Sequence, residues 1–114
     1  MSELFAGVPV TRLEQALPWW ERLTERPPDF FPNDNEAVWQ LGGGWVYLVG
    51  DSERAGNALL TVLVDDLDSH VAELSERGLE TEPIDTIPNV VRKAATADPD
   101  GNWVTFGEGL GDGA

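Results

Sequence analysis

The fold is decided by the stretch Asp98-Pro99-Asp100-Gly101-Asn102 and the run that follows it, Trp103-Val104-Thr105-Phe106-Gly107-Glu108. In the first five residues Pro99 fixes φ, the aspartates can accept hydrogen bonds from nearby amides, and Gly101 accepts a positive φ. These properties predict a tight turn. Side chains in the run that follows alternate between two faces, as they do in a β-strand. We therefore predict a turn that leads into a last strand.

An earlier part of the chain repeats this pattern. The segment Val8–Trp20 aligns with Val62–Leu74, with apolar residues at matching positions, and Gly43–Leu48 aligns with Gly101–Phe106. Both offsets are close to half the length of the chain. Any two amphipathic helices could give the first match, but they do not explain the second match in the same order. An internal duplication of a strand–helix–strand–strand unit is therefore the better explanation.

Periodicity and turn residues predict the elements of each half. In the first half, Thr11 and Glu14 form a capping-box pattern before a helix, and Phe30 and Phe31 are aromatic anchors in a loop over 25–35. The other elements predicted for this half are a strand over 4–10, a helix over 12–24 and strands over 36–41 and 45–49. For the second half we predict a strand over 58–64, a helix from Asp65 or Asp66 to Arg77, an extended segment over 79–84, a turn over 87–89, and strands over 90–97 and 103–108.

Composition excludes several classes of function. The chain has 114 residues, no cysteine and a net charge of −14, from 7 basic and 21 acidic residues. Disulfides and thiolate metal sites are therefore excluded, and the charge repels nucleic acids and anionic membranes while attracting cations. The acidity could also serve solubility alone. The sequence shows neither a membrane-length apolar run nor a signal-peptide pattern, so we expect a cytoplasmic protein with no nucleic-acid or membrane partner.

The motif Val62-x-Val64-x-Asp66-Leu67-Asp68, followed by the Asp98–Asn102 turn, resembles the vicinal oxygen chelate superfamily, which includes glyoxalase I, extradiol dioxygenases and bleomycin-resistance proteins. The resemblance covers about residues 4–108. It implies an α+β fold in which two tandem βαβββ modules form a curled mixed sheet, with a pocket on the concave face. Within one domain over 1–114, module one would span about 4–50 and module two about 58–108, with a flexible tail over 109–114.

The resemblance also implies where metal ligands would lie. The expected positions fall on Phe5 and Tyr47 in module one and on Leu59 and Thr105 in module two. A divalent metal needs carboxylate oxygens or imidazole nitrogens, which these side chains do not provide. We therefore predict that the protein binds no metal and needs no cofactor. The only histidine, His70, is expected on the surface of the second helix.

Strand parity predicts an aromatic, weakly polar face for the pocket. Trp45 and Trp103 occupy equivalent places in the repeat, and two indoles could bracket a flat or cationic group. The same rings could instead fill the core or a dimer interface. The predicted ligand-binding residues are Phe5, Trp39, Trp45, Tyr47, Leu59, Thr61, Trp103 and Thr105.

Two functional classes fit this sequence best. The first is a binding protein similar to bleomycin-resistance proteins, which would sequester a small molecule, aromatic or cationic, without changing it. The alternative is a glyoxalase-like lyase, isomerase or dioxygenase-related enzyme that works without metal or with an atypical metal site. A module whose function is dimerisation is a third option. No nucleophile–base set stands out, so no catalytic residue is assigned, and the resemblance implies a homodimer.

Overall fold

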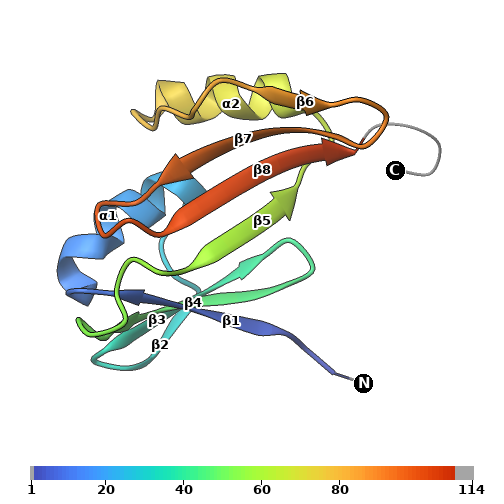
Figure 1. Cartoon of the computed structure of the whole chain (residues 1–114). Coiled ribbons are helices and arrows are strands. Elements are labelled where there is room, and N and C mark those ends of the chain that lie inside the picture. Colours follow the sequence, from blue (N-terminus) through green and yellow to red (C-terminus); the bar gives the residue numbers. More distant parts are fainter. Residues whose placement is uncertain (1, 110–114) are drawn as a thin grey trace.

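The computed structural model describes residues 2–109 and contains two βαβββ modules (Figure 1). Module one consists of β1 (Phe5–Val10), α1 (Leu13–Thr24), β2 (Phe30–Asn33), β3 (Glu36–Leu41) and β4 (Gly44–Gly50). Module two consists of β5 (Leu59–Leu63), α2 (Leu67–Glu76), β6 (Asp85–Ile87), β7 (Val91–Ala97) and β8 (Trp103–Gly109). The predicted α+β fold is confirmed. Except for Gly109, the tail predicted over 109–114 lies outside the described residues.

Each module forms its own four-stranded mixed sheet, with strand orders β1-β4-β3-β2 and β5-β8-β7-β6. The first strand of each module pairs in parallel with the last strand, and the other pairs are antiparallel. Phe5 pairs with Trp45 in one sheet and Leu59 pairs with Trp103 in the other. The sequence repeat therefore appears as two separate sheets in which equivalent residues of the first and last strands are paired.

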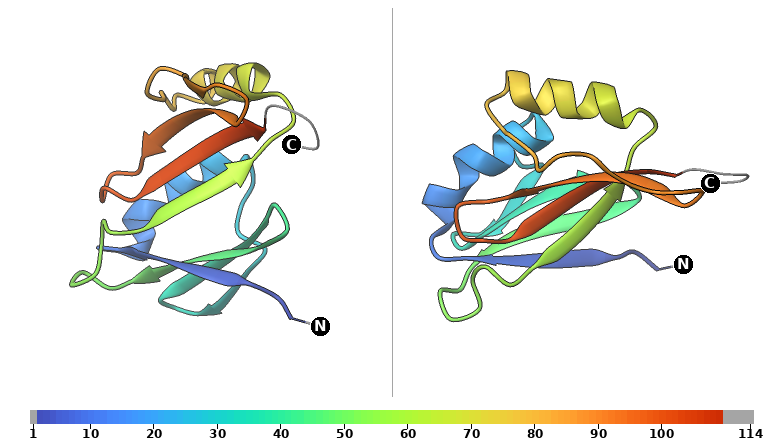
Figure 2. Two further views of the ribbon diagram at one scale, coloured as in Figure 1. Left: turned by 45° about the vertical axis from the view of Figure 1, so that its right-hand side comes forward. Right: turned by 45° about the horizontal axis from the view of Figure 1, so that its top comes forward.

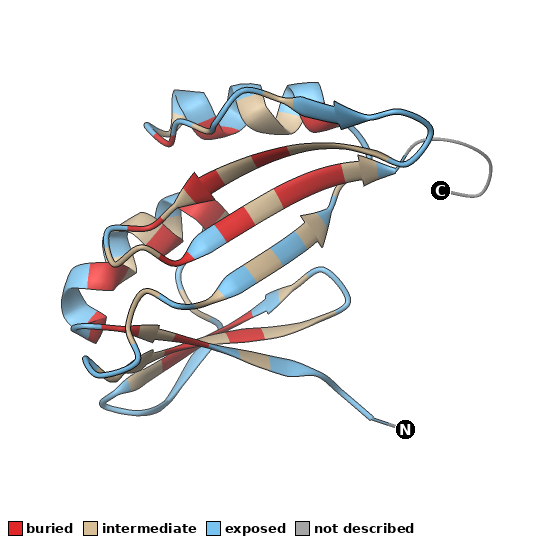
Figure 3. Ribbon diagram, in the orientation of Figure 1, coloured by how far each residue is buried: buried red, intermediate tan, exposed pale blue. Residues whose placement is uncertain are grey.

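Both helices lie on the same side of the strands, α1 against β3 and β4 and α2 against β7 and β8 (Figure 2). The sheet faces that point toward the helices carry the apolar core. Buried and more exposed residues alternate along the strands (Figure 3), because successive side chains of a strand point to opposite faces. Fully burying one large apolar side chain stabilises the fold by about 1.5–3 kcal/mol. The largest fully buried apolar side chains are Trp20, Trp39, Leu48, Leu67, Leu74, Val8, Val10 and Val104.

The sequence analysis missed two short edge strands. The segment predicted as a loop over 25–35 contains β2, and the turn predicted over 87–89 overlaps the end of β6. All residues of both strands are exposed, so neither strand shows the apolar alternation that reveals a half-buried strand. Pro32 is compatible with β2 because an edge strand does not need every backbone donor.

The capping box predicted at Thr11 and Glu14 is wrong. Arg12 is the N-cap of α1 and makes no side-chain capping bond. The backbone N–H and the hydroxyl of Thr11 instead donate to Asp100 Oδ1, which belongs to module two. The helix start predicted at Asp65 or Asp66 is confirmed at Asp66, whose Oδ1 accepts a bond of 3.1 Å from Ser69 N.

The turn formed by Asp98–Asn102 ties the two modules together. Asp98 is buried, and its Oδ2 accepts bonds from Trp20 Nε1 on α1 at 3.1 Å and from Asn102 Nδ2 at 3.0 Å. The same Asn102 amide donates to Pro9 O at 2.8 Å, and its Oδ1 accepts from Ala58 N at 2.9 Å. These bonds satisfy polar groups that would otherwise be costly to bury. The stretch that identifies the fold is thus also the polar link between β1, α1 and β5.

Candidate functional site

The face of the first sheet that points away from the helices, called here the first open face, carries a cluster of aromatic rings. Phe5 stacks on Trp45, with ring centroids 5.5 Å apart and planes inclined by 7°. Phe30 meets Trp45 edge-on at 6.1 Å. The indole Nε1 of Trp45 donates to Glu3 Oε2 at 3.1 Å. Trp45 is therefore the common support of two rings that come from β1 and β2.

Tyr47 lies across the neighbouring strand because Gly7 leaves room for its ring. Tyr47 and Gly7 are paired in register on β4 and β1. A Cβ atom on Gly7 would lie 2.7 Å from both Cζ and the hydroxyl oxygen of Tyr47, closer than van der Waals contact allows. The missing side chain at position 7 therefore sets the position of the Tyr47 ring.

These rings border a hollow of about 370 Å³ that we call the aromatic hollow. Sheet register explains its composition, because Phe30 pairs with Val38, Val38 with Tyr47, and Tyr47 with Gly7, so one row crosses four strands. Val38 is only 3% exposed and forms the floor. The lining residues are Phe5, Phe30, Pro32, Glu36, Val38 and Tyr47.

Among residues 2–109, Glu36 is the only acidic residue that lines the aromatic hollow. Glu36 is half-buried, and its Oε1 accepts a hydrogen bond of 2.7 Å from Asn33 Nδ2. The shape can enclose a small organic group, the rings offer stacking surfaces, and the carboxylate offers a hydrogen-bond acceptor and a negative charge. These are the properties of a binding site with a few placed polar groups.

The second sheet has an equivalent open face with different chemistry. Leu59 and Leu63 on β5 are 80% and 70% exposed, and Trp103 on β8 is 36% exposed. Thr61 and Thr105 lie side by side between them in register. Trp45 and Trp103 therefore lie on different sheets, and the ring contacts of Trp45 among the described residues are with Phe5 and Phe30.

The prediction that Trp39 faces the pocket is wrong. The β3–β4 hairpin pairs Leu41 with Gly44, which places Trp39 opposite Val46 on the helix-facing side. Trp39 is fully buried, its centroid is 6.5 Å from that of Trp20, and its Nε1 donates to Arg26 O at 3.1 Å.

Sequence reasoning missed four of the residues that line the aromatic hollow, namely Phe30, Pro32, Glu36 and Val38. A signal for two of them was present. Counting back from the tight turn at Gly42 and Gly43 pairs Val38 with Tyr47 and Glu36 with Val49, which puts both on the pocket face. Phe30 and Pro32 had no such signal, because β2 itself was not predicted.

The surface position predicted for His70 is only partly correct, because the residue is half-buried. Its ring packs on Phe106 of β8, with centroids 4.3 Å apart, and its Nε2 is buried with no hydrogen-bond partner within the described range. Burial lowers the pKa of His70 below its ordinary 6.5, and nearby Arg77 lowers the pKa further, while Glu73 opposes the shift. A signal for this packing was present in the sequence, since His70 lies three residues after Leu67 and four before Leu74, on the face of α2 that carries the apolar stripe.

The four positions considered for metal ligands, Phe5, Tyr47, Leu59 and Thr105, lie on the open faces of the two sheets. Over residues 2–109 no group of three or more histidine, cysteine, aspartate or glutamate side chains is arranged to hold a metal ion. No helix in that range is long and apolar enough to cross a membrane.

Comparisons with known proteins agree with the fold. Residues 5–106 match the family described as Glyoxalase/Bleomycin resistance protein/Dioxygenase superfamily. A glyoxalase/bleomycin resistance protein from Catenulispora acidiphila DSM 44928 superposes with a TM-score of 0.87 at 44% identity, over 95% of this chain and 98% of that one. Among functionally curated proteins the sequence finds no significant match.

Two more distant structures share the fold. TnmS3, an antibiotic binding protein from Streptomyces sp. CB03234, has a TM-score of 0.76 at 22% identity, over 96% of both chains. A bleomycin-binding protein from Streptomyces verticillus, complexed with copper(II)-bleomycin, has a TM-score of 0.73 at 19% identity, over 93% of this chain and 94% of that one. The extent of the family match and the 44% identity show that this chain belongs to the glyoxalase/bleomycin resistance protein/dioxygenase superfamily, the vicinal oxygen chelate group that its motifs resemble.

Proposed function

We propose that this protein binds and sequesters a small organic molecule at the aromatic hollow and leaves it chemically unchanged. The observation that carries the proposal is the hollow itself, where Phe5, Phe30 and Tyr47 surround the floor at Val38. Its volume of about 370 Å³ falls within the range of small-molecule sites. The proteins of this fold that bind an antibiotic or bleomycin support the same type of function.

The rings have separate roles in this proposal. Phe5 and Phe30 present faces or edges to a flat ligand, and each aromatic contact contributes about 0.5–1.5 kcal/mol beyond the burial of area. Trp45 does not line the hollow itself but contacts Phe5 and Phe30 and fixes the positions of their rings. Tyr47 adds a hydroxyl that can donate or accept a hydrogen bond at the wall of the hollow.

We also propose that the second open face, formed by Leu59, Thr61, Leu63, Trp103 and Thr105, is buried in a homodimer. Two exposed leucines next to a partly exposed indole form an unusual surface for an isolated chain, since exposed apolar patches commonly mark association sites. In such a dimer, residues of this face could complete the aromatic hollow of the partner subunit.

A pair of neighbouring phenylalanines provides the test of binding. Phe30 lines the aromatic hollow, whereas Phe31 next to it does not, and the two are 45% and 54% exposed. Tryptophan fluorescence is followed during titration with bleomycin and a panel of aromatic antibiotics, and mass spectrometry checks that the recovered ligand is unchanged. Phe30→Ala should weaken binding by about tenfold, and Phe31→Ala should leave it unchanged. Equal effects of the two variants, or conversion of the ligand, would contradict the proposal.

The dimer is tested by light scattering at micromolar concentration. The wild type should give twice the chain mass of 12.4 kDa. Leu63→Glu should shift the protein to a monomer, while Val90→Glu, a matched change at an exposed valine outside this face, should not. A wild-type mass of one chain would rule the dimer out.

A further inference from the structure

We infer that the aromatic hollow is selective for charge, and that its ligand is an aromatic molecule bearing a protonated or quaternary amine, held by the rings and by the carboxylate of Glu36. This inference rests on the proposed function and specifies the chemical class of the ligand. It depends on the juxtaposition of Phe5, Phe30, Tyr47 and Glu36 around one hollow.

The first argument concerns the carboxylate of Glu36. Asn33 engages Oε1 only, so in the part of the chain that the structure describes Oε2 has no protein donor. No ion pair involves Glu36 among residues 2–109, and no lysine or arginine lines the hollow. The carboxylate of Glu36 lies beside apolar surface and is left without a cation, and a cationic ligand would supply one.

The second argument concerns the rings. The faces of Phe5, Phe30 and Tyr47 carry negative electrostatic potential, which attracts a cation within about 6 Å of a ring centroid. Glu3 accepts a hydrogen bond from Trp45, the ring on which Phe5 and Phe30 rest. This places a second carboxylate at the edge of the same cluster. The net charge of −14 adds long-range attraction for cations that salt weakens.

Three probes of one size test the inference, namely benzylammonium, benzyl alcohol and benzoate, which differ mainly in charge. Titrations followed by tryptophan fluorescence and by NMR line shifts should rank the affinities in that order. Benzylammonium should bind about fivefold more tightly than benzyl alcohol, which is the advantage expected of a partly exposed cation–π contact with a nearby carboxylate.

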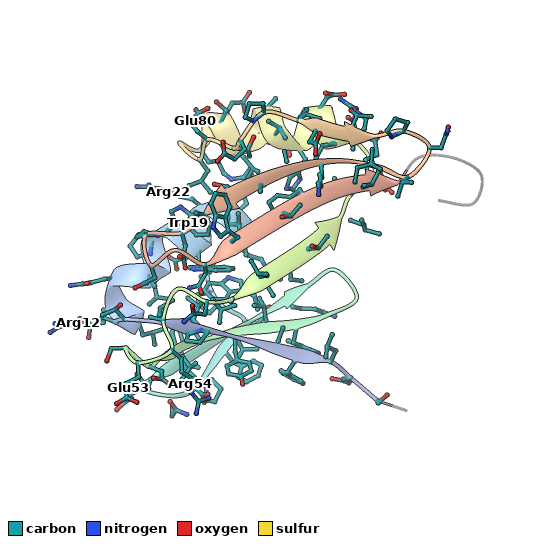
Figure 4. The ribbon with its side chains drawn as sticks, viewed as in Figure 1. Arg12, Trp19, Arg22, Glu53, Arg54 and Glu80 are labelled. Carbon is teal, nitrogen blue, oxygen red and sulfur yellow. The ribbon has the colours of Figure 1, made fainter. Side chains whose placement is uncertain are left out.

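The variant Glu36→Gln isolates the local carboxylate, because glutamine keeps an oxygen acceptor for Asn33. It should abolish the preference for benzylammonium over benzyl alcohol. Glu53→Gln changes the net charge by the same amount from the exposed loop between β4 and β5 (Figure 4) and should leave the preference intact. Equal losses in both variants would mean that only the overall charge matters, and would overturn the inference.

The outcomes also separate this inference from the proposed function. If all three probes bind equally and Phe30→Ala weakens each of them, the hollow binds ligands without charge selection, so the inference fails and the proposed function stands. If benzylammonium does not bind at millimolar concentration, the inference is likewise overturned. The proposed function is then judged by the antibiotic titrations with Phe30→Ala and Phe31→Ala.

Discussion

The two modules share one backbone plan and differ in where their polar and aromatic side chains lie. In module one the open face carries the rings of Phe5, Trp45 and Tyr47, and its hairpin turn consists of glycines. In module two the open face carries two exposed leucines, two threonines and the single indole of Trp103, and the equivalent turn holds the buried residues Asp98 and Asn102. Strand order and the pairing of the first strand with the last strand match in the two modules, so the open faces differ in their side chains, whereas the two hairpin turns also differ in length. One copy supplies the candidate site and the other supplies the link.

The largest effect is expected from the link. In the wild type, Asp98 Oδ2 accepts hydrogen bonds from Trp20 Nε1 and Asn102 Nδ2. Asp98→Asn can place an NH2 group at that position, which faces these two N–H groups and cannot accept their hydrogen bonds. Each unmet buried donor costs about 1–3 kcal/mol, so the free energy of unfolding should fall by about 2–5 kcal/mol in urea titrations. Asp34→Asn, a matched change at an exposed aspartate, should shift it by less than about 0.5 kcal/mol. Similar midpoints for the two variants would show that the turn is not the link.

The equivalent tryptophans should differ in their contribution to stability. Trp45 is half-buried and contacts two rings, so Trp45→Ala should cost about 2 kcal/mol and also weaken ligand binding. Trp103 is 36% exposed and makes no ring pair among the described residues, so Trp103→Ala should cost about 1 kcal/mol or less in the monomer. Thermal melts measure both. A loss for Trp103→Ala as large as that for Trp45→Ala would mean that Trp103 is packed in the core or in the dimer interface, and would contradict this difference between the two open faces.

Two glycines on open-face strands, Gly7 on β1 and Gly107 on β8, refine the comparison on a smaller scale. Gly7→Ala forces the Tyr47 ring to move, since the new Cβ would lie 2.7 Å from it, whereas at Gly107 the nearest atoms, in Leu63 and Val91, lie at 3.2 Å. We expect a stability loss of about 1 kcal/mol for Gly7→Ala and less for Gly107→Ala. Only Gly7→Ala should weaken ligand binding. Retention of full affinity by Gly7→Ala would show that the position of Tyr47 does not matter.

The smallest expected effect is a pH dependence of stability that arises from α2 and not from α1. His70 of α2 aligns with Ala16 of α1, and burial lowers the pKa of His70 below 6.5. The unfolded chain therefore binds the proton more readily, so this contribution to stability is complete above pH 6.5 and is lost as pH falls toward the folded-state pKa. His70→Ala should remove that loss. The difference between the urea midpoints of wild type and variant should therefore change between pH 7.5 and pH 5. An unchanged difference across this range would contradict the burial of the His70 ring nitrogen Nε2 against β8.

The fold was predictable because it depends on patterns that sequence displays directly. The repeat of Val8–Trp20 in Val62–Leu74 and the turn at Asp98–Asn102 predicted two modules, and strand parity placed Phe5, Trp45 and Tyr47 on one face. The hollow was less predictable because it depends on pairing between strands. One wrong parity at Trp39 hid Val38 and Glu36, and the exposed strand β2 gave no pattern that would have revealed Phe30 and Pro32.

The link made by the Asp98–Asn102 turn also constrains the order in which the protein folds. Its bonds to module one join residues that are 78 to 93 positions apart, from 78 between Trp20 and Asp98 to 93 between Pro9 and Asn102. Contacts between such distant residues form late, because closing a long loop costs entropy before any contact repays it. During synthesis, which proceeds from the N-terminus, the indole N–H of Trp20 in α1 cannot reach its partner Asp98 until that turn has been made. Docking of the two modules therefore has to follow synthesis of Asp98–Asn102, and this turn acts as the latch.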